Sequence, residues 1–389
     1  MNPGPTVFTQ ILAGVDPKEV TRSAARYPMP RASRTLTAYD HFATMVFAQL
    51  THRLSLRDIE ACLRSRAARA YQMGIRGNVT RTNLAYANEH RDWRVFSAIA
   101  TVLMRRARRL YADAPFELGL EADLFALDAT VIELSLTLCP WARWQAGQAA
   151  IRLNVLLDLR EDLPVFVSLY EGDRNEMAAL DEIPVYPGSY YVLDRGYLHF
   201  LRLYRLHAAG AYFVTRLKSG IRYYVAASRP VDATTGLRCD QTIRLNSRQG
   251  RKDYPESLRR ISYVDPETGQ ALVFLTNQFE LTALVIAQIY RRRWAIELFW
   301  RWLKQHLRLR GFFSNNPNGV RVQIWSALCA YLLVAIAKQK KHLTPSLYEI
   351  LQVVSVSSLE QIALEELFMK NDTRTTRVDI PNQLEINYS

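Results

Sequence analysis

Three acidic residues, far apart in the sequence, stand where a carboxylate could do chemistry. Asp128 lies inside the β-prone run LFALDATV, where an unpaired charge is costly to bury. Asp194 ends the run YYVLD, and the carboxyl ends of strands are where α/β sheets place their ligands. Glu297 is the one acid in the basic, aromatic run IYRRRWAIELFWRWLKQHLRLR (289–310). Three carboxylates offer the hard oxygen ligands that Mg²⁺ and Mn²⁺ prefer, and two such ions can promote phosphodiester cleavage.

The run around Glu297 is expected to form one helix over residues 290–304. At about 100° per residue, a polar stripe about 60° wide then contains Tyr290, Arg293, Glu297 and Lys304. The opposite, apolar face is expected to pack on a core and carries Ile296, Phe299 and Leu303. The tryptophans of the run are expected to pack rather than to bind, and they are Trp294, Trp300 and Trp302. Trp294 lies nearest the polar stripe and is the one that could meet DNA instead.

Each acid also has a simpler interpretation. Glu297 could belong to a row of i,i+4 ion pairs on a solvated helix face, which contributes tenths of a kcal/mol per pair. Asp128 could be satisfied by a turn, and Asp194 could cap a helix or lie in a loop. The combination of a strand acid, a strand-end acid and a helix acid is more specific than any one of them, and it favours a shared metal site.

The spacing of these residues resembles the DDE transposases, which have an RNase H-like catalytic core. In particular it is similar to the bacterial insertion-sequence transposases of the insertion sequence four family, whose helix carries Tyr-x2-Arg-x3-Glu-x6-Lys. That signature is matched at every spacing by Tyr290, Arg293, Glu297 and Lys304. The family's Asp-x-Thr and Asp-x-Gly-Tyr motifs are matched by Asp128 with Thr130, and by Asp194 with Gly196 and Tyr197. A β-rich insertion between the second Asp and the Glu also matches, at 197–270, and the resemblance covers residues 115–340.

This resemblance implies a reaction and the residues that carry it. Asp128, Asp194 and Glu297 would be catalytic and would hold two Mg²⁺ ions, which Mn²⁺ could replace. Cleavage at the end of the element would free a 3′-OH, which would then attack the complementary strand or the target DNA in cut-and-paste transposition. No covalent protein–DNA intermediate would be needed. Double-stranded DNA, as element ends and target, would be the partner of a homodimer that pairs two ends.

The DNA contacts implied by the resemblance lie on the same helix. Arg293 and Lys304 would contact phosphates, and Tyr290 would lie near the cleaved end. Further candidate contacts are Arg301 on that helix and, in FVTRLKSG (213–220), Arg216 and Lys218, for which a solvated basic strand end is the simpler interpretation.

One feature of the insertion departs from the family. Some relatives stack a flipped base on a tryptophan there, but this sequence has no Trp between residues 145 and 293. Tyr223, Tyr224 or Tyr254 could substitute, although core packing is the simpler role for each. The departure bears on how the second strand is cut, and on hairpin formation in particular.

The composition fits a DNA-binding protein without a membrane segment. The chain has 389 residues, a formal net charge of +13 and a sequence pI of about 9.6, which favours polyanionic partners. Its four cysteines form no C-x-x-C pair, so neither a zinc site nor a disulfide framework is indicated. No signal peptide is evident, and a bacterial cytoplasmic, nucleoid-associated location is expected. The longest apolar stretch, at 324–337, is short for a bilayer and is expected to be a buried core helix.

The periodicity predicts an α/β protein with an RNase H-like mixed sheet flanked by helices. Three strands in succession, near 118–138, 150–160 and 163–172, precede strands that alternate with helices. We expect a helical DNA-end-binding region at 1–115, the first part of the core at 116–220, a β-rich insertion at 221–270, the second part of the core at 271–345, and a C-terminal helix with a polar tail at 346–389.

The first of these regions could contain a helix-turn-helix. A helix at 55–66 begins after Ser55, a turn follows at 73–78, and a second helix is expected over 79–111. In such a motif Arg81 and Asn83, at the start of the second helix, would meet base edges. An ordinary helical bundle is an equally good interpretation.

Three functions therefore compete. The first is an active transposase, and the second is a domesticated or inactive nuclease with the same RNase H-like fold. The third is a non-catalytic, sequence-specific DNA-binding protein in which the acids are structural. A glycoside hydrolase would also use two carboxylates, but it explains neither the net charge nor the arginines around Glu297.

Overall fold

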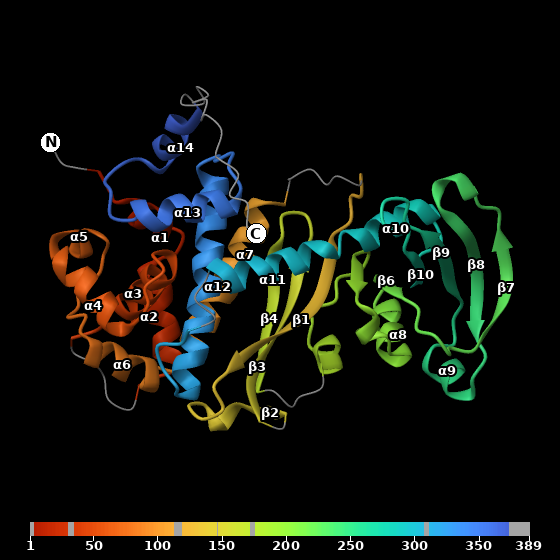
Figure 1. The fold of residues 1–389 in the computed structure, drawn as a ribbon, viewed down its shortest axis with the longest axis horizontal. Coiled ribbons are helices and arrows are strands. Elements are labelled where there is room, and N and C mark those ends of the chain that lie inside the picture. Colours follow the sequence, from red (N-terminus) through yellow and green to blue (C-terminus); the bar gives the residue numbers. More distant parts are fainter. Residues whose placement is uncertain are drawn as a thin grey trace, which may run out of the picture.

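The computed structural model describes residues 4–29, 35–112, 119–145, 147–171, 176–306 and 311–372. The molecule is elongated (Figure 1), with the N-terminal helices at one end, the strands of the core in the middle and the β-rich insertion at the other end. Helix α11 (Trp294–His306) crosses the middle of the molecule in front of the strands.

Seven helices lie in the described part of the N-terminal region. They are α1 (Val7–Leu12), α2 (Pro17–Arg26), α3 (Ala38–Leu50), α4 (Leu56–Ser65), α5 (Ala67–Gln72), α6 (Arg81–His90) and α7 (Arg94–Leu110). Ser55 caps α4, as the sequence predicts, and Thr37 forms a capping box on α3 with Asp40. Helix α3 is buried from Asp40 to its end at Leu50, so it forms the centre of this bundle.

The helix expected over 79–111 is interrupted at residues 91–93. The Arg91 guanidinium is buried there and donates to the carbonyls of Leu36 and Thr37. The Trp93 backbone N–H donates to Asn318 instead of continuing the helix. Tertiary hydrogen bonds to other elements therefore end α6 and start α7 anew, and local periodicity does not reveal them.

The ten strands in the described part of the chain belong to one mixed sheet. They are β1 (Leu124–Leu134), β2 (Arg143–Gln145), β3 (Gln148–Asp158), β4 (Leu163–Glu171), β5 (Tyr190–Leu193), β6 (Tyr212–Arg216), β7 (Tyr223–Arg229), β8 (Leu237–Leu245), β9 (Leu258–Val264) and β10 (Ala271–Thr276). The order is β2-β3-β1-β5-β6-β10-β9-β8-β7, with β4 paired to β3. Strands β1, β3 and β4 are antiparallel, and β1, β5 and β6 are parallel.

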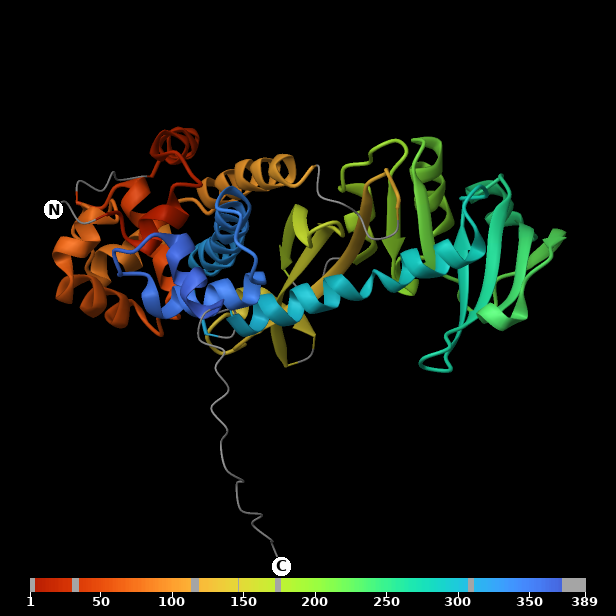
Figure 2. The same cartoon turned by 90° about the horizontal axis from the view of Figure 1, so that it is seen from above.

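Helices cover both faces of the central strands (Figure 2). Alternate residues of β1 divide between two cores: Leu124 and Ala126 pack with α7 and α12 (Pro317–Lys340), whereas Phe125 and Leu127 face α8 (Phe200–Ala208). The core on the α12 side continues without interruption into the N-terminal bundle. The predicted α/β fold with a mixed sheet flanked by helices is confirmed.

Helix α12 is the core helix that the apolar stretch predicts. Among the described residues it alone is long and apolar enough to cross a membrane, but 94% of its most apolar window is buried inside the protein. It packs against α7 and α3, so it joins the N-terminal bundle to the rest of the fold.

The two ends of the described chain also meet. The Gln10 side chain donates to the Ile362 carbonyl and accepts from the Leu364 N–H, which ties α1 to the segment between α13 (Leu347–Ser357) and α14 (Leu364–Asp372). Of the predicted polar tail at 370–389, the first three residues belong to α14, and residues 373–389 lie outside the described residues.

The β-rich insertion continues the sheet outward from β10 through β9, β8 and β7, with the short helix α9 (Arg248–Asp253) beside it. A buried ion pair holds it, in which Arg259 Nη2 lies 2.7 Å from Asp240 Oδ2. Between β4 and β5 the chain forms a 3₁₀ helix over Glu176–Asp181.

Candidate active site

Asp128 and Asp194 come from neighbouring parallel strands. The β1–β5 register pairs Leu127 with Leu193, and the residue that follows each leucine is an aspartate, Asp128 or Asp194. Adjacent strands lie about 4.8 Å apart, which brings the two backbones side by side. Alternation along β1 and β5 directs both side chains to the face that α12 and α11 cover. The described structure thus brings two of the three predicted acids together.

Asp194 also makes the local contact of a capping residue. Its carboxylate accepts a hydrogen bond of 3.3 Å from the Gly196 N–H at the start of a 3₁₀ turn, Arg195–Tyr197. The Thr215 hydroxyl on β6 donates to the Asp194 carbonyl at 3.3 Å. The capping interpretation therefore holds, but it uses one backbone N–H and leaves the side chain partly exposed, so it does not compete with a second role.

Helix α11 lies across this face and presents Glu297. As predicted, Ile296, Phe299 and Leu303 are buried on its core side. Glu297 is partly exposed, and its carboxylate accepts a hydrogen bond of 2.6 Å from Arg293 Nη2. The i,i+4 ion pair of the simpler interpretation is therefore present.

The prediction of one helix through 290–304 is wrong. Helix α10 (Ala283–Arg291) ends and α11 begins at Trp294. The joint is tightened, because the N–H groups of Arg293, Ala295 and Ile296 each bond the carbonyl three residues earlier, instead of four. Tyr290 therefore belongs to a different helix from Glu297, and it does not lie on the polar stripe that one regular helix would give.

Tyr290 shows the consequence. It was expected on a polar stripe, but only 7% of it is exposed, and its ring packs on Phe274 of β10 with centroids 5.0 Å apart. Its hydroxyl has no hydrogen-bond partner among the described residues. Burial raises the pKa of Tyr290; the charge of Asp194 adds to the rise, and Arg293 and Arg216 oppose it.

Arg293 lies among the signature residues. Burial alone would lower the pKa of its guanidinium, but Tyr290, Glu297 and Asp194 around it raise that pKa on balance. Its charge therefore acts on carboxylates of both the helix and the strand end. Arg293 is the group that links Tyr290, Asp194 and Glu297 into one electrostatic cluster.

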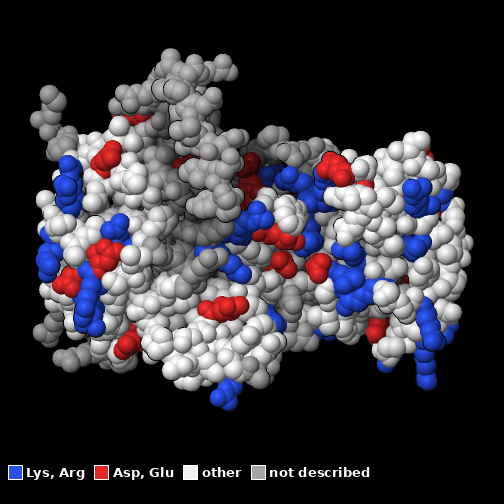
Figure 3. Space-filling model, viewed as in Figure 1, with Lys and Arg blue, Asp and Glu red and all other residues white. Residues whose placement is uncertain are grey.

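A basic cavity of about 800 Å³ opens beside this cluster. Arg216, Arg291 and Arg293 line it together with Trp294, of which 52% is exposed. Figure 3 shows Lys and Arg side chains gathered where α11 crosses the sheet and toward the insertion, with acidic residues between them. Arg291 is exposed, and Arg216 and Arg293 are partly exposed. Accessible guanidinium groups beside an exposed aromatic ring suit a nucleic acid backbone and its bases.

The other predicted DNA contacts have different settings. Arg301 on α11 and Lys218 after β6 are exposed, and Lys304 is partly exposed. The backbone N–H of Arg81, at the start of α6, donates to the Glu60 carboxylate. The side-chain amide of Asn83 donates to the Asn78 carbonyl, so Asn83 stabilises a turn. The DNA contacts of all five residues stay predictions, as does the helix-turn-helix.

The insertion tyrosines differ in exposure. Tyr254 is buried and its hydroxyl bonds His207 Nδ1 at 2.7 Å, so it is a core residue and cannot stack a base. Tyr224 is 48% exposed on β7, at the far end of the sheet. The side chain of Trp302 lies outside the described residues.

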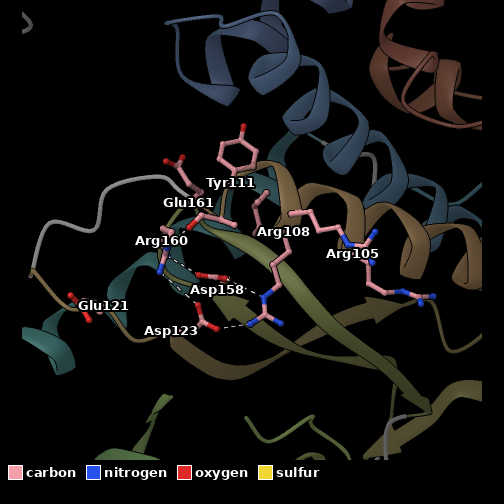
Figure 4. Close-up of a pocket in the computed structure, with 11 residues that line it drawn as sticks. Arg105, Arg108, Tyr111, Glu121, Asp123, Asp158, Arg160 and Glu161 are labelled. Carbon is pink, nitrogen blue, oxygen red and sulfur yellow. Dashed lines mark hydrogen bonds and ion pairs between the residues drawn. The ribbon is translucent and has the colours of Figure 1, made fainter. Parts of the chain in front are cut away.

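A second cavity lies where the N-terminal helices meet the sheet (Figure 4). Arg108 of α7 reaches Asp123 at 2.6 Å and Asp158 at 3.9 Å, and Arg160 reaches Asp123 at 3.7 Å. The lining contains four arginines and four acids, so their formal charges cancel. Burial raises the pKa of Asp158. These contacts describe an ion-paired seam between α7 and the sheet, not a site for an anion.

The donor set fits a divalent cation in part. Asp128 and Asp194 are hard oxygen donors on adjacent strands, as Mg²⁺ or Mn²⁺ requires. Glu297 is engaged by Arg293, and among the described residues no three His, Cys, Asp or Glu side chains are grouped closely enough to hold an ion. Asp128 and Asp194 are therefore the well-placed pair, and Glu297 is the nearby acid on α11.

Sequence reasoning missed a hydrogen-bond partner of Asp128. Trp300 was expected only to pack, but its indole Nε1 donates to Asp128 Oδ2 at 3.1 Å. The one signal available was its position three residues after Glu297, on the same side of a helix.

Known proteins match most of this chain. Residues 119–333, more than half of it, match the family described as Transposase DDE domain, and residues 3–76 match a domain of unknown function. A putative transposase of Sinorhizobium fredii is 34% identical over 67% of this chain and 72% of its own length. A putative transposase for insertion sequence element IS4SA of Synechocystis is 24% identical over 84% and 91%. The probable transposase for IS5377 of Geobacillus stearothermophilus is 27% identical over 62% of each chain.

Among solved structures, a piggyBac transposase synaptic complex with hairpin DNA aligns with 97% of this chain and 83% of that chain, at 9% identity and a TM-score of 0.43, a likeness too weak to support a conclusion. The family match and the sequence relatives support an enzyme that acts on DNA and depends on divalent metal ions, over the regulator and the glycoside hydrolase. The chain belongs to the DDE transposases of bacterial insertion sequences.

Proposed function

We propose that this transposase cuts at the ends of its element and joins the freed 3′-OH to target DNA, with Asp128, Asp194 and Glu297 as its catalytic carboxylates. The observation that carries the proposal is the β1–β5 register, which sets Asp128 beside Asp194 beneath the helix that bears Glu297. Cut-and-paste transposition is the form of the reaction that we propose.

Asp128 and Asp194 would hold the divalent ions, Mg²⁺ in the cell, and Glu297 would complete the site on release from Arg293. Bound there, such ions lower the pKa of water and stabilise charge that develops on phosphate and leaving oxygens. The chain's own residues supply the rest. Arg293 balances the charge of the carboxylates around it. The pairing of β5 with β1 on one side and with β6 on the other holds the backbone at the aspartates.

The basic surface beside the acids would bind the DNA backbone. Arg216 and Arg293, with Arg301 and Lys304 further along α11, would contact phosphates and carry no sequence information themselves. Trp294 would meet DNA from the same cavity. Tyr290 would support Arg293 from below, because its ring lies 5.8 Å from the guanidinium carbon.

We further propose that the N-terminal helices bind the element ends, that two copies pair two ends in the DNA complex, and that the protein works in the bacterial cytoplasm at the nucleoid. The net charge of +13 supports a polyanionic partner.

The test uses purified protein and a plasmid that carries the gene's own flanking DNA, with Mg²⁺, Mn²⁺, Ca²⁺ or EDTA. Breaks are mapped at nucleotide resolution for the natural protein and for Glu297→Gln. Metal-dependent breaks at the flanking ends that the variant lacks would support the proposal. Tight binding without cleavage in any metal, equal in both proteins, would overturn it.

A further inference from the structure

Trp300 connects two elements that carry candidate metal ligands. It lies on α11, three residues after Glu297, and its indole Nε1 donates a hydrogen bond of 3.1 Å to Asp128 Oδ2 on β1. Only 6% of Trp300 is exposed, so water competes poorly for this contact. A hydrogen bond to a carboxylate in such a setting is stronger and more directional than one on the surface.

The orientation of the indole is fixed from behind. Phe299 packs against Trp300 with ring centroids 5.3 Å apart, and the edge of Tyr331 on α12 meets Phe299 at 5.4 Å. The Tyr331 hydroxyl is tied in turn to the Asp162 carbonyl at 2.9 Å. Burial of Trp300 and its contact with Phe299 restrict the indole, which helps to keep its N–H directed at Asp128.

We propose that Trp300 is a positioning residue for the metal site. Its N–H holds the Asp128 carboxylate in the orientation that ligation requires, and it sets α11, and with it Glu297, in register with β1. This inference rests on the proposed function of Asp128 as a metal ligand. Outer-shell donors of this kind orient ligating carboxylates in metal sites.

The chemistry of the indole suits that role. An indole has one N–H donor, no acceptor and no charge, so it can orient a carboxylate without ligating the ion itself. A lysine or arginine at this place would instead neutralise Asp128 and compete with the ion by charge. The Trp300 indole thus orients the Asp128 carboxylate without itself neutralising that charge.

The alternative is that Trp300 only fills space, and the chain offers a matched control. Trp325 on α12 is also buried, with 4% exposed, and its ring stacks on Trp93. Its Nε1 has no hydrogen-bond partner among the described residues. Trp325→Phe therefore removes a buried indole N–H that orients nothing, whereas Trp300→Phe removes the one that contacts Asp128.

The experiment measures Mn²⁺ affinity of the full chain, without DNA, by titration calorimetry for the natural protein, Trp300→Phe, Trp325→Phe and Asp128→Asn. We expect Trp300→Phe to bind Mn²⁺ about tenfold more weakly or worse, Trp325→Phe to bind as the natural protein does, and Asp128→Asn to lose the site. Equal affinities for Trp300→Phe and the natural protein would overturn the inference. If Asp128→Asn binds Mn²⁺ normally, the proposed function fails instead.

A shape-preserving replacement separates the hydrogen bond from packing. Substituting 3-benzothienylalanine at position 300 keeps the two fused rings and replaces the N–H by sulfur. This protein should bind Mn²⁺ as weakly as Trp300→Phe does, and natural affinity would assign Trp300 to packing alone. As a second readout, the indole ¹⁵N–¹H signal that Trp300→Phe removes should shift on addition of Mg²⁺ and in Asp128→Asn. A signal that moves in neither case would also overturn the inference.

Discussion

His41 should make the N-terminal bundle sensitive to mild acid. It lies on the buried helix α3, its Nε2 lies 2.8 Å from Asn88 Oδ1, and Phe96 meets its ring edge-on at 5.2 Å. Burial lowers the pKa of His41 to about 3; the charge of Arg91 contributes, and the bond to Asn88 opposes the shift. Its Nδ1 has no hydrogen-bond partner among the described residues, so a proton there would be unsatisfied.

The direction of the pH effect follows from the protonation of His41 in the folded and the unfolded protein. An unfolded chain protonates histidine near pH 6.5, whereas folded His41 stays neutral to about pH 3. Above pH 6.5 both states hold a neutral ring, and His41 then adds no pH dependence. Below it, the unfolded state gains a proton that the folded state refuses, and the folded state loses about 1.4 kcal/mol per pH unit. At pH 4.5 the loss is about 2.7 kcal/mol.

The assay compares the natural protein with His41→Gln, whose side chain can donate to Asn88 but cannot be protonated. Hydrogen exchange of the α3 amides at pH 7.5 and 4.5, corrected for the intrinsic rate, gives the opening free energy of that helix at each pH. The natural protein should lose about 2.7 kcal/mol more than the variant between the two pH values. Equal losses would refute the reasoning. Carboxyls with raised pKa values, such as Asp158, contribute equally to both proteins and cancel.

Three further changes test other parts of the fold. Arg259→Gln breaks the buried pair with Asp240, whose side chains are 3% and 6% exposed, and should lower the unfolding free energy of the insertion by about 3–5 kcal/mol in urea melts; a loss below about 1 kcal/mol would contradict that. Gly236→Ala places a Cβ 2.4 Å from the Val264 carbonyl at a φ of +88°, so a loss above about 1 kcal/mol is expected, and none would show that the turn relaxes. Arg301→Ala should reduce the slope of log K against log salt for element-end DNA by about 0.9, one phosphate contact; an unchanged slope would remove Arg301 from the interface.

Much of the architecture is predictable from local pattern. The β-prone runs near 118–138, 150–160 and 163–172 contain β1, β3 and β4, and the apolar face of α11 is buried at Ile296 and Phe299 as its spacing indicates. Ser55 caps α4 where the sequence places it. These features depend on neighbours within a few residues, which is why sequence reasoning reaches them.

The missed features depend on distant partners. The helix breaks between α10 and α11, and Tyr290 at the end of α10 packs inward on Phe274 of strand β10. The bond from Trp300 to Asp128 spans 172 residues of sequence, so periodicity cannot indicate it. The pairing of Asp128 with Asp194 follows from strand register, which a sequence of alternating strands and helices leaves open.

The most direct test of the central claim is an anomalous scattering map of crystals grown with Mn²⁺. The account predicts Mn²⁺ bound by carboxylate oxygens of both Asp128 and Asp194, at about 2.1 Å as for the similar Mg²⁺, with Glu297 turned from Arg293 toward the ion. Ordered Mn²⁺ held elsewhere, with neither aspartate as a ligand, would contradict the assignment of this site.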